Sequence, residues 1–326
     1  MLAAMKTVIH IHRYTLRSKG ALNAKSSRSE HPGALIRVED EGFHGYGCVH
    51  PWPELGDEEL DKHLEMLASG TKTALVARAM ECAGLDGHAR RLKASLFSGI
   101  VVPRSHASLS MDEDDFESAV NAGYSCVKVK VGKEVASEVD FIRDQAQRFA
   151  DLNWRLDFNG VLDTAEVERF LANLGEDVRG KIDFIEDAYK LGSTPWVNAA
   201  GPYGIPMAVD REVADACGDF GVMVIKPALL TARPLLRRAL RERKRVVFTS
   251  YMDHPLGQCF AAWEAGRALA SFPDVVDTCG LNTQGLFEPN AFSEAMRATG
   301  PEFSPPKGTG LGFDDELSNL SWELLS

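Results

Sequence analysis

Three short apolar runs that each end on an acidic residue restrict the possible folds of this chain more than any other feature. The runs lead into Asp157, Glu186 and Asp210, and they follow one another at intervals of roughly 25 residues, as successive strand and helix units do. The carboxyl ends of neighbouring parallel strands lie at one edge of a sheet, so the three carboxylates are expected to lie close together. The sequence therefore predicts an acidic site at the ends of parallel strands.

The alternation of strands and helices extends over most of the chain. An open doubly wound sheet would have fewer strands and a glycine-rich first turn, and none opens this region. We therefore predict the α/β class, as a modified TIM barrel of the (β/α)7β type. The eight runs predicted as strands are residues 107–110, 127–131, 155–157, 184–186, 207–210, 223–226, 246–250 and 275–278.

The first hundred residues are organised differently and predict an α+β unit. Residues 7–17 and 33–39 alternate like antiparallel strands, joined by a polar stretch, 18–32, that is expected to form a mobile loop. Residues 42–52 are expected to form a second, glycine-rich turn. Helical spacing then runs from Asp57, a predicted N-cap, to about residue 96, with a break near residues 69–70.

Three lysines also lie on predicted strands of the barrel. Lys128 and Lys130 are two residues apart on the second strand, so their side chains point the same way, and Lys226 ends the sixth strand. The second and sixth strands of an eight-stranded barrel are opposite one another, and active sites form at the carboxyl ends of the strands. The amines are therefore expected to face each other across the acids. Arg155 and Asn159 share a strand face with Asp157.

The predicted acids and lysines together suit metal-assisted proton transfer. Asp157, Glu186 and Asp210 would be hard oxygen ligands, which favour Mg²⁺, with Mn²⁺ as the alternative. A lysine can act as a base only when it is neutral, and a second lysine beside it with a divalent cation nearby would lower its pKa. Taken singly, such an acid is often a helix N-cap and such a lysine a solvent-facing strand end. Their joint occurrence favours a site.

Composition excludes several other classes of function. A net charge of -11 argues against nucleic acid or an anionic membrane surface as a partner. No apolar run approaches the ~20 residues that span a bilayer, so a cytoplasmic protein is expected. The six cysteines form no C-x-x-C pair and are expected to be reduced. The glycine-rich segment 308–312 lacks a following helix, so it is expected to return to the N-terminal unit and not to bind phosphate.

These residues resemble the enolase superfamily, within it the muconate-lactonising group, and most of all the o-succinylbenzoate synthases. Lys128-Val129-Lys130 matches the K-x-K motif of that group, the three acids match its Mg²⁺ ligands, and Lys226 matches its lysine after the sixth strand. The resemblance covers most of the chain. It implies a capping domain at residues 1–104, completed by residues 286–326, over a barrel at residues 105–285. Loops at residues 18–32 and 48–56 would help to select the substrate.

The resemblance also implies an activity, the syn dehydration of 2-succinyl-6-hydroxy-2,4-cyclohexadiene-1-carboxylate to 2-succinylbenzoate in menaquinone biosynthesis. Lys130 would remove the α-proton and then assist departure of the hydroxyl, Lys226 would stabilise the enediolate, and Lys128 would tune Lys130. Arg155 resembles an arginine that supports the reacting end, with a salt bridge that orders the ligands as its alternative. The remaining candidates for substrate contacts are Asn159, Ser250, Gly280 and Leu281.

The sequence departs from the pattern of that family in the residues around the site. Asp187-Ala188 follows Glu186 where Glu-Pro is usual, and Arg211-Glu212 follows Asp210 where Glu-Ser is usual. Residues 251–254, Tyr-Met-Asp-His, replace a smaller and more polar stretch after the seventh strand. None of these changes removes a predicted ligand, but the last can reshape the substrate pocket.

Several other functions stay open from the sequence. An N-acylamino-acid racemase or a muconate cycloisomerase of the same superfamily would use the same residues. A dipeptide epimerase is disfavoured because residues 278–282 lack its Asp-x-Asp motif. More remote are a metal-independent Schiff-base aldolase acting through Lys226 and a non-catalytic scaffold. The expected partner is a small carboxylate, and the chain is a monomer or a homo-oligomer.

Overall fold

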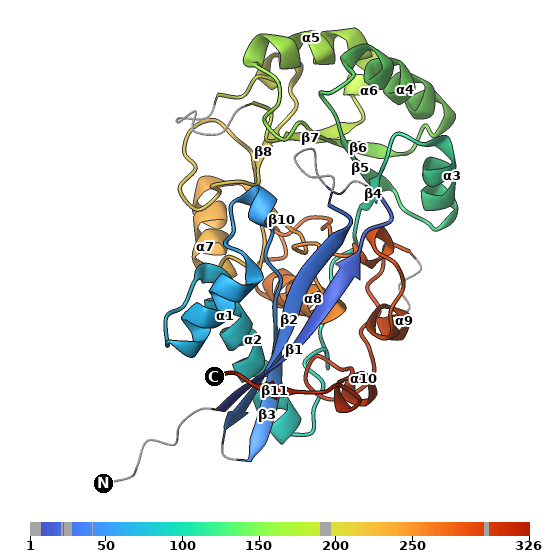
Figure 1. The fold of residues 1–326 in the computed structure, drawn as a ribbon. Helices are drawn as coiled ribbons and strands as arrows, with labels where there is room; N and C mark the ends of the chain where they lie inside the picture. The colour runs from blue at the N-terminus through green and yellow to red at the C-terminus, as the bar shows by residue number, and fades with distance from the viewer. Residues whose placement is uncertain (1–7, 21, 23–27, 41, 190–196, 297–299) are drawn as a thin grey trace.

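The computed structural model describes residues 8–20, 22, 28–40, 42–189, 197–296 and 300–326, and it has two sheets (Figure 1). One is a four-stranded antiparallel sheet in the order β11-β1-β2-β3, and the other is a seven-stranded parallel sheet in the order β10 to β4. The predicted combination of a parallel barrel with an antiparallel N-terminal domain is confirmed. The strands are β1 (Val8–Arg17), β2 (Glu30–Asp40), β3 (Phe43–Val49), β4 (Ala107–Leu109), β5 (Cys126–Lys130), β6 (Asn153–Asp157), β7 (Ile182–Glu186), β8 (Met207–Val209), β9 (Val222–Ile225), β10 (Arg245–Phe248) and β11 (Glu323–Leu324).

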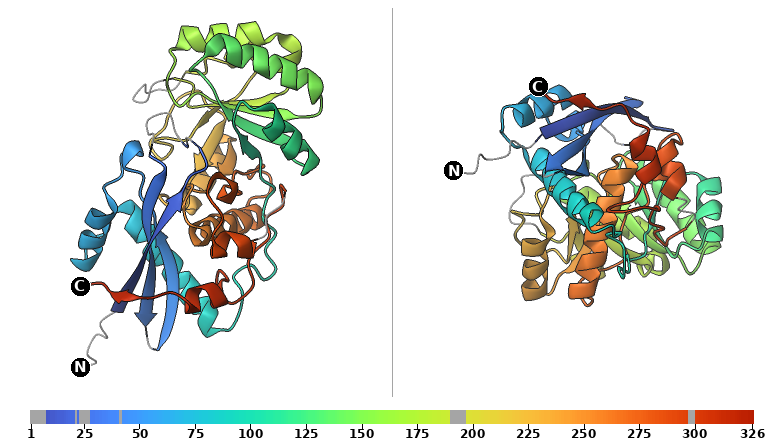
Figure 2. Two further views of the ribbon diagram at one scale, coloured as in Figure 1. Left: turned by 45° about the vertical axis from the view of Figure 1, so that its right-hand side comes forward. Right: turned by 90° about the horizontal axis from the view of Figure 1, so that it is seen from below.

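The helices of the barrel follow its strands along the chain, as the predicted rhythm requires. Local sequence sets where they begin: Asp163 and Glu166 form a reciprocal capping box at the start of the helix after β6, and Asp112 caps the helix after β4. Figure 2 shows them on the outside of the parallel sheet. They are α3 (Glu113–Asn121), α4 (Val135–Arg148), α5 (Thr164–Leu174), α6 (Glu176–Arg179), α7 (Ala232–Glu242) and α8 (Pro255–Ser271).

The helix expected after β8 is missing, which corrects the sequence-based prediction at this point. Residues 210–221 are all described and contain no helix. Glu212 has a left-handed φ of 57°, which a helix cannot contain. The chain therefore passes from Asp210 to β9 through turns.

The segment predicted as the eighth strand closes the barrel through single bridges and forms no continuous strand. Val276 pairs in parallel with Val246 on β10, and Cys279 pairs with Ser105 just before β4. The backbone N–H of His106 donates to the Cys279 carbonyl at 2.7 Å. Residues 275–280 thus fill the gap between the two edge strands, as the (β/α)7β description implies.

The N-terminal domain contains a strand where a glycine-rich turn was expected. β3 pairs with β2 over residues 43–49 because Gly45 and Gly47 allow α2 (Ala74–Arg91) to pack directly on its backbone. A Cβ at Gly45 would lie 2.0 Å from the Ala83 carbonyl, and one at Gly47 would lie 2.1 Å from that of Ala79. These glycines therefore serve close packing and not chain reversal.

The rest of the N-terminal domain agrees with its predicted helices, apart from one cap. α1 (Leu60–Ala68) and α2 are separated at residues 69–70 as expected, but α1 is preceded by Glu59. Asp57, the predicted cap, binds Trp52 and Tyr251 instead. The remaining helical segments are the 3₁₀ turns η1 (Pro53–Leu55), η2 (Gly201–Tyr203) and η3 (Gln284–Leu286), and the short helices α9 (Ala291–Met296) and α10 (Asp314–Ser318).

The C-terminal end of the chain returns to the N-terminal domain, as residues 308–312 suggested. β11 pairs with β1, and the buried Asp86 carboxylate of α2 accepts hydrogen bonds from the backbone N–H groups of Leu311 and Tyr46 at 2.6 and 3.0 Å. All six cysteines have free thiols. No helix within the described ranges has the length and apolar character that crossing a bilayer requires.

Candidate active site

The register of the parallel sheet brings the predicted acids and lysines to one end of the barrel. Lys130 pairs with Asp157, and Asp157 pairs with Glu186 on the next strand. Asp210 directly follows β8, and Lys226 directly follows β9. The three acids, Lys130 and Lys226 therefore lie at or just beyond the carboxyl ends of their strands, where barrel active sites form, and Lys128 lies one position further in on the same face of β5.

Lys128 lies between two of the predicted metal ligands. Its Nζ is 3.0 Å from the Asp157 carboxylate and also donates to Glu186. Burial alone would lower the pKa of Lys128, but Asp157, Glu186 and Asp210 hold it above its ordinary value. Lys128 is therefore a permanent cation here and is not suited to act as the base.

Lys130 has the opposite balance of effects. Desolvation lowers its pKa, and the nearby charges of Lys128 and Lys226 lower it further, although Asp157 opposes them. The residue itself is exposed at the end of β5. The Lys130 Nζ donates to the carbonyl of Leu22, which lies in the expected loop 18–32. Of that loop, residues 21 and 23–27 lie outside the described residues.

Lys226 forms the other side of the site. Its Nζ donates to the Asp210 carboxylate and lies 5.9 Å from the centre of the Tyr251 ring. The Asp210 backbone is held by Asp187, whose Oδ1 accepts the Asp210 N–H at 3.1 Å. The charge of Lys226 thus lies between a carboxylate and an aromatic ring.

The donor chemistry of the three acids fits a hard divalent cation, but the lysines now lie among the carboxylates. Burial, with repulsion from Asp157 and Asp210, raises the pKa of Glu186 to about 7, even though Lys128 opposes the shift. A divalent cation would relieve that repulsion. Within the described ranges no group of three His, Cys, Asp or Glu side chains is arranged to hold a metal ion. The ammonium groups of Lys128 and Lys226 bind the carboxylate oxygens instead.

The residues that follow the acids adopt left-handed backbone conformations. Asn159 has a φ of 50° and Asp187 a φ of 44°. The Asn159 N–H donates to Asp157 Oδ1 at 3.1 Å, and its side-chain oxygen accepts from Arg211 at 3.3 Å. Asn159, a predicted substrate contact, therefore supports Asp157 and Arg211 in this structure. Such strained turns are common at functional sites.

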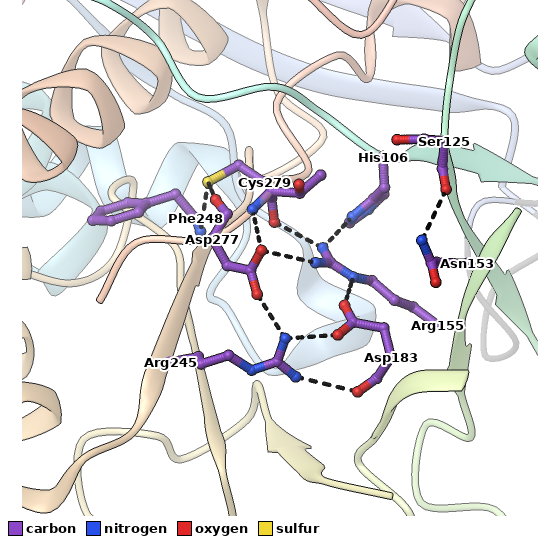
Figure 3. A network of polar contacts seen from close by, with 10 residues as sticks. His106, Ser125, Asn153, Arg155, Asp183, Arg245, Phe248, Asp277 and Cys279 are labelled. Atoms are coloured by element: carbon purple, nitrogen blue, oxygen red, sulfur yellow. Dashed lines mark hydrogen bonds and ion pairs between the residues drawn. The ribbon is translucent and has the colours of Figure 1, made fainter. Parts of the chain in front are cut away.

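Arg155 is buried in the barrel interior and binds protein groups there (Figure 3). Its guanidinium donates to Asp183 at 2.8 Å, to His106 Nδ1 at 2.9 Å and to the Thr278 carbonyl at 2.8 Å. Arg245 completes the network by bridging Asp183 and Asp277. Arg155 thus forms a salt bridge, but with Asp183, which is not one of the predicted ligands, and both roles predicted for Arg155 stay untested.

The other predicted substrate contacts lie where the barrel closes. The Ser250 hydroxyl shares a hydrogen bond of 2.6 Å with Thr283. The Gly280 N–H donates to the Phe248 carbonyl at 2.8 Å, and the Leu281 N–H donates to Ser105 at 3.2 Å. A Cβ at Gly280 would lie 2.7 Å from His106, so glycine is needed for close packing. Both N–H groups thus donate to acceptors within the protein. Their predicted binding of a succinyl tail stays a prediction.

Two residues near the site were not assigned to it from the sequence. Tyr251 was noted only as a departure from a family pattern, and Asp57 was expected to cap a helix. The one available signal was the position of Tyr251 directly after Ser250, because a residue beyond a strand end can line the mouth of a barrel. Tyr251 and Asp57 are 194 residues apart in the chain, so no local pattern predicts their hydrogen bond.

The comparisons with known proteins agree on one family. Residues 9–89 match the model of the O-succinylbenzoate synthase N-terminal domain. An o-succinylbenzoate synthase from Bdellovibrio bacteriovorus is 31% identical over 95% of this chain and 96% of its own length. One from Edwardsiella ictaluri is 25% identical over 83% of this chain and 90% of its own length.

Solved structures show the same fold at lower identity. An L-Ala-D/L-Glu epimerase from Bacillus subtilis superposes with a TM-score of 0.75 at 17% identity, covering 94% of this chain and 98% of its own. An N-succinyl Arg/Lys racemase from Bacillus cereus superposes with a TM-score of 0.75 at 20% identity, covering 98% and 100%. At these identities the likeness concerns the fold alone.

Proposed function

Because this chain belongs to the o-succinylbenzoate synthase family of the enolase superfamily and is an enzyme, we propose that it carries out the dehydration typical of that family. The substrate would be 2-succinyl-6-hydroxy-2,4-cyclohexadiene-1-carboxylate and the product 2-succinylbenzoate. The observation that carries the proposal is the contrast between two lysines of one strand. Lys128 is held charged by carboxylates, whereas the pKa of Lys130 is lowered. A lysine needs such a lowered pKa to accept a proton near neutral pH.

The roles of the lysines follow from their surroundings. Lys130 would take the α-proton of the substrate as a neutral amine, and its ammonium form would then donate a proton to the departing hydroxyl on the same face. Lys226, on the other side of the acids and paired with Asp210, would stabilise negative charge on the substrate carboxylate as a cation. Lys128 would keep the proton on its own nitrogen and raise the local positive potential that keeps Lys130 neutral.

We propose Asp157, Glu186 and Asp210 as the ligands of Mg²⁺, with Mn²⁺ as an alternative. When bound, the ion would hold the substrate carboxylate and offset the negative charge that builds on it as the proton leaves. Asp187 would support this site by accepting a hydrogen bond from the Asp210 backbone N–H, which fixes the position of Asp210. Asn159, Ser250, Gly280 and Leu281 remain proposed substrate contacts, and Arg155 a proposed support for the reacting end.

The domain assignment belongs to the same proposal. Residues 1–104, with residues 286–326, would cap a barrel of residues 105–285, which the pairing of β11 with β1 supports. The contact from Lys130 to Leu22 supports a role for the loop 18–32 at the mouth of the barrel. A small carboxylate partner, a cytoplasmic location and a place in menaquinone biosynthesis complete the proposal.

Loss of the cyclohexadiene absorbance of the substrate tests this function directly. We expect rapid loss with Mg²⁺ and none with excess EDTA. Binding of Mn²⁺, followed by electron paramagnetic resonance, reports on the metal site without any turnover. Absence of turnover by a protein that binds the metal would move the substrate to an acylamino acid, a dipeptide or a muconate. Trapping of Lys226 by borohydride would favour an aldolase instead.

A further inference from the structure

Three residues outside the cluster of acids and lysines join the N-terminal domain to the segment after β10. Asp57 Oδ2 accepts hydrogen bonds from the Trp52 N–H and from the Tyr251 hydroxyl, both at 2.8 Å. The Trp52 indole N–H donates to the Tyr251 carbonyl, also at 2.8 Å. Trp52 is fully buried and Tyr251 is 4% exposed, so both ends of this connection are fixed by packing.

Tyr251 presents its ring to Lys226. The Nζ of Lys226 lies 5.9 Å from the ring centre, within the range at which an aromatic face attracts a cation. Burial and the nearby Asp57 raise the pKa of the Tyr251 hydroxyl, so this group keeps its proton and donates it to Asp57. The ring therefore has a fixed position beside the ammonium group.

The N-terminal domain also holds the backbone next to Lys226. Arg78 of α2 is buried, and its Nε donates to the carbonyl of Pro227 at 2.8 Å. The N-terminal domain thus reaches Lys226 in two ways, through Arg78 on the adjoining Pro227 backbone and through Asp57, which holds Tyr251 beside the ammonium group. Asp210 accepts a hydrogen bond from the ammonium group.

We propose that Tyr251 is a positioning residue for Lys226 and that Trp52 and Asp57 hold its ring in place, so that docking of the N-terminal domain sets the geometry of this lysine. The inference rests on the proposed function, in which Lys226 stabilises charge on the reacting substrate. A purely structural Tyr251 would affect stability alone, because it would have no preferential effect on the transition state.

Steady-state kinetics of matched variants separate the two roles. Tyr251→Leu removes the ring and hydroxyl, and we expect a loss of about tenfold in kcat with KM within about twofold. Tyr251→Phe and Asp57→Ala both remove the hydrogen bond between these two side chains and should each cost about threefold. The double variant should lose less than the two single losses combined, because that bond is common to both. Asp57→Asn keeps an oxygen that can accept both bonds and should restore the rate. Glu58→Ala, an exposed acid of the same segment, is the control.

Thermal unfolding of each variant identifies those that fail to fold, and Tyr251→Phe and Asp57→Asn preserve the size and shape of the buried side chains. Kinetic losses that disappear when the rates are corrected for the folded fraction would overturn the proposal. Additive losses from Tyr251→Phe and Asp57→Ala would also overturn it, since the two residues would then act separately.

Trace acetylation in the absence of substrate gives a readout that does not depend on the reaction. The rate of acetylation of Lys226, relative to the exposed Lys72, is measured by peptide mass spectrometry. We expect a several-fold increase in Tyr251→Leu, because the ring no longer covers and positions the amine, and little change in Glu58→Ala. An unchanged rate would overturn the inference. The expected increase in a protein that does not turn over the diene would keep the positioning of Lys226 and reject the proposed substrate.

Discussion

The barrel interior holds two clusters of charge that are built in opposite ways. Near the amino ends of the strands, Arg155 and Arg245 bind Asp183 and Asp277 through contacts of 2.6 to 2.8 Å, in a balanced set of two cations and two anions. At the carboxyl ends the cations are lysines. There the pKa of Lys128 is raised and that of Lys130 is lowered. Arginine keeps its proton at all ordinary pH values, whereas lysine can lose it. The arginine cluster at the amino ends, here called the lower cluster, is therefore suited to hold the barrel together. The lysine cluster at the carboxyl ends, here called the upper cluster, is suited to move protons.

The largest effect that would support this contrast is loss of turnover without loss of stability at the upper cluster. Lys130→Ala and Lys226→Ala should each lower kcat by about 10³-fold or more, because each would remove a group that we propose acts on the reacting substrate. Absorbance assays measure the rates, and urea unfolding should show a change below about 1 kcal/mol. Substantial turnover by either variant would remove that lysine from the proposed chemistry.

The lower cluster should give the reverse result. Arg155→Met leaves Asp183 and Asp277 to Arg245 alone, and it leaves His106 and the Thr278 carbonyl without their donor. Breaking a buried charge pair in this way should lower the free energy of unfolding by about 3–5 kcal/mol. Arg155→Lys, which keeps the charge but loses the forked geometry, should lie between this variant and the wild type.

Turnover by the same variant decides between the two roles considered for Arg155. If it acts through structure alone, kcat corrected for the folded fraction should fall by no more than a few fold. A loss comparable to that of Lys130→Ala, with stability unchanged, would instead show that the arginine supports the reacting end.

Metal affinity gives a smaller and more specific test of the upper cluster. Glu186→Gln should weaken Mn²⁺ binding by roughly tenfold or more, since it would remove a charged oxygen from the proposed ligand set. The measurement is a titration followed by electron paramagnetic resonance, with the exposed Glu212→Gln as the matched control. Equal affinities of the two variants would remove Glu186 from the ligand set.

The two clusters also differ in how far the sequence could predict them. The grouping of Asp157, Glu186 and Asp210 could be predicted because each ends an apolar run, and parallel pairing alone brings such ends together. Arg245 ends the basic stretch 241–245, a pattern typical of the end of a helix. Its partners Asp183 and Asp277 lie 62 and 32 residues away in the chain. No local periodicity encodes those contacts, which depend on closure of the whole barrel.

Errors in the predicted fold have the same physical origin. Gly45 and Gly47 were interpreted as turn residues, but the close approach of α2, visible only in three dimensions, requires them. Glu212 follows a strand and resembles a helix start, yet its left-handed backbone leads into a turn. By contrast, α3 and α5 begin directly after residues that favour a helix start, Asp112 and Asp163, so local sequence is enough to place their first turns.

The smallest predicted effect is a difference in pH dependence between the clusters. Burial alone would raise the pKa of Asp183, but Arg155 and Arg245 lower it, so the charged form stabilises the fold. This stability is complete above the unfolded-state pKa of about 3.9 and is lost as the pH falls through the lower folded-state value. The difference in unfolding free energy between wild type and Arg155→Met should therefore be constant over roughly pH 5 to 8 and should shrink below about pH 4.

At the upper cluster the relevant pKa belongs to a base, Lys130, and the property that depends on pH is the rate of turnover. Because Lys130 acts as a base only when neutral, kcat/KM should fall as the pH drops through its pKa, which lies below the ordinary lysine value. Rates and unfolding free energies measured over the same pH series test both statements at once. A rate that falls only where stability falls would mean that one cluster controls both properties, and the division of labour between the two ends of the barrel would be wrong.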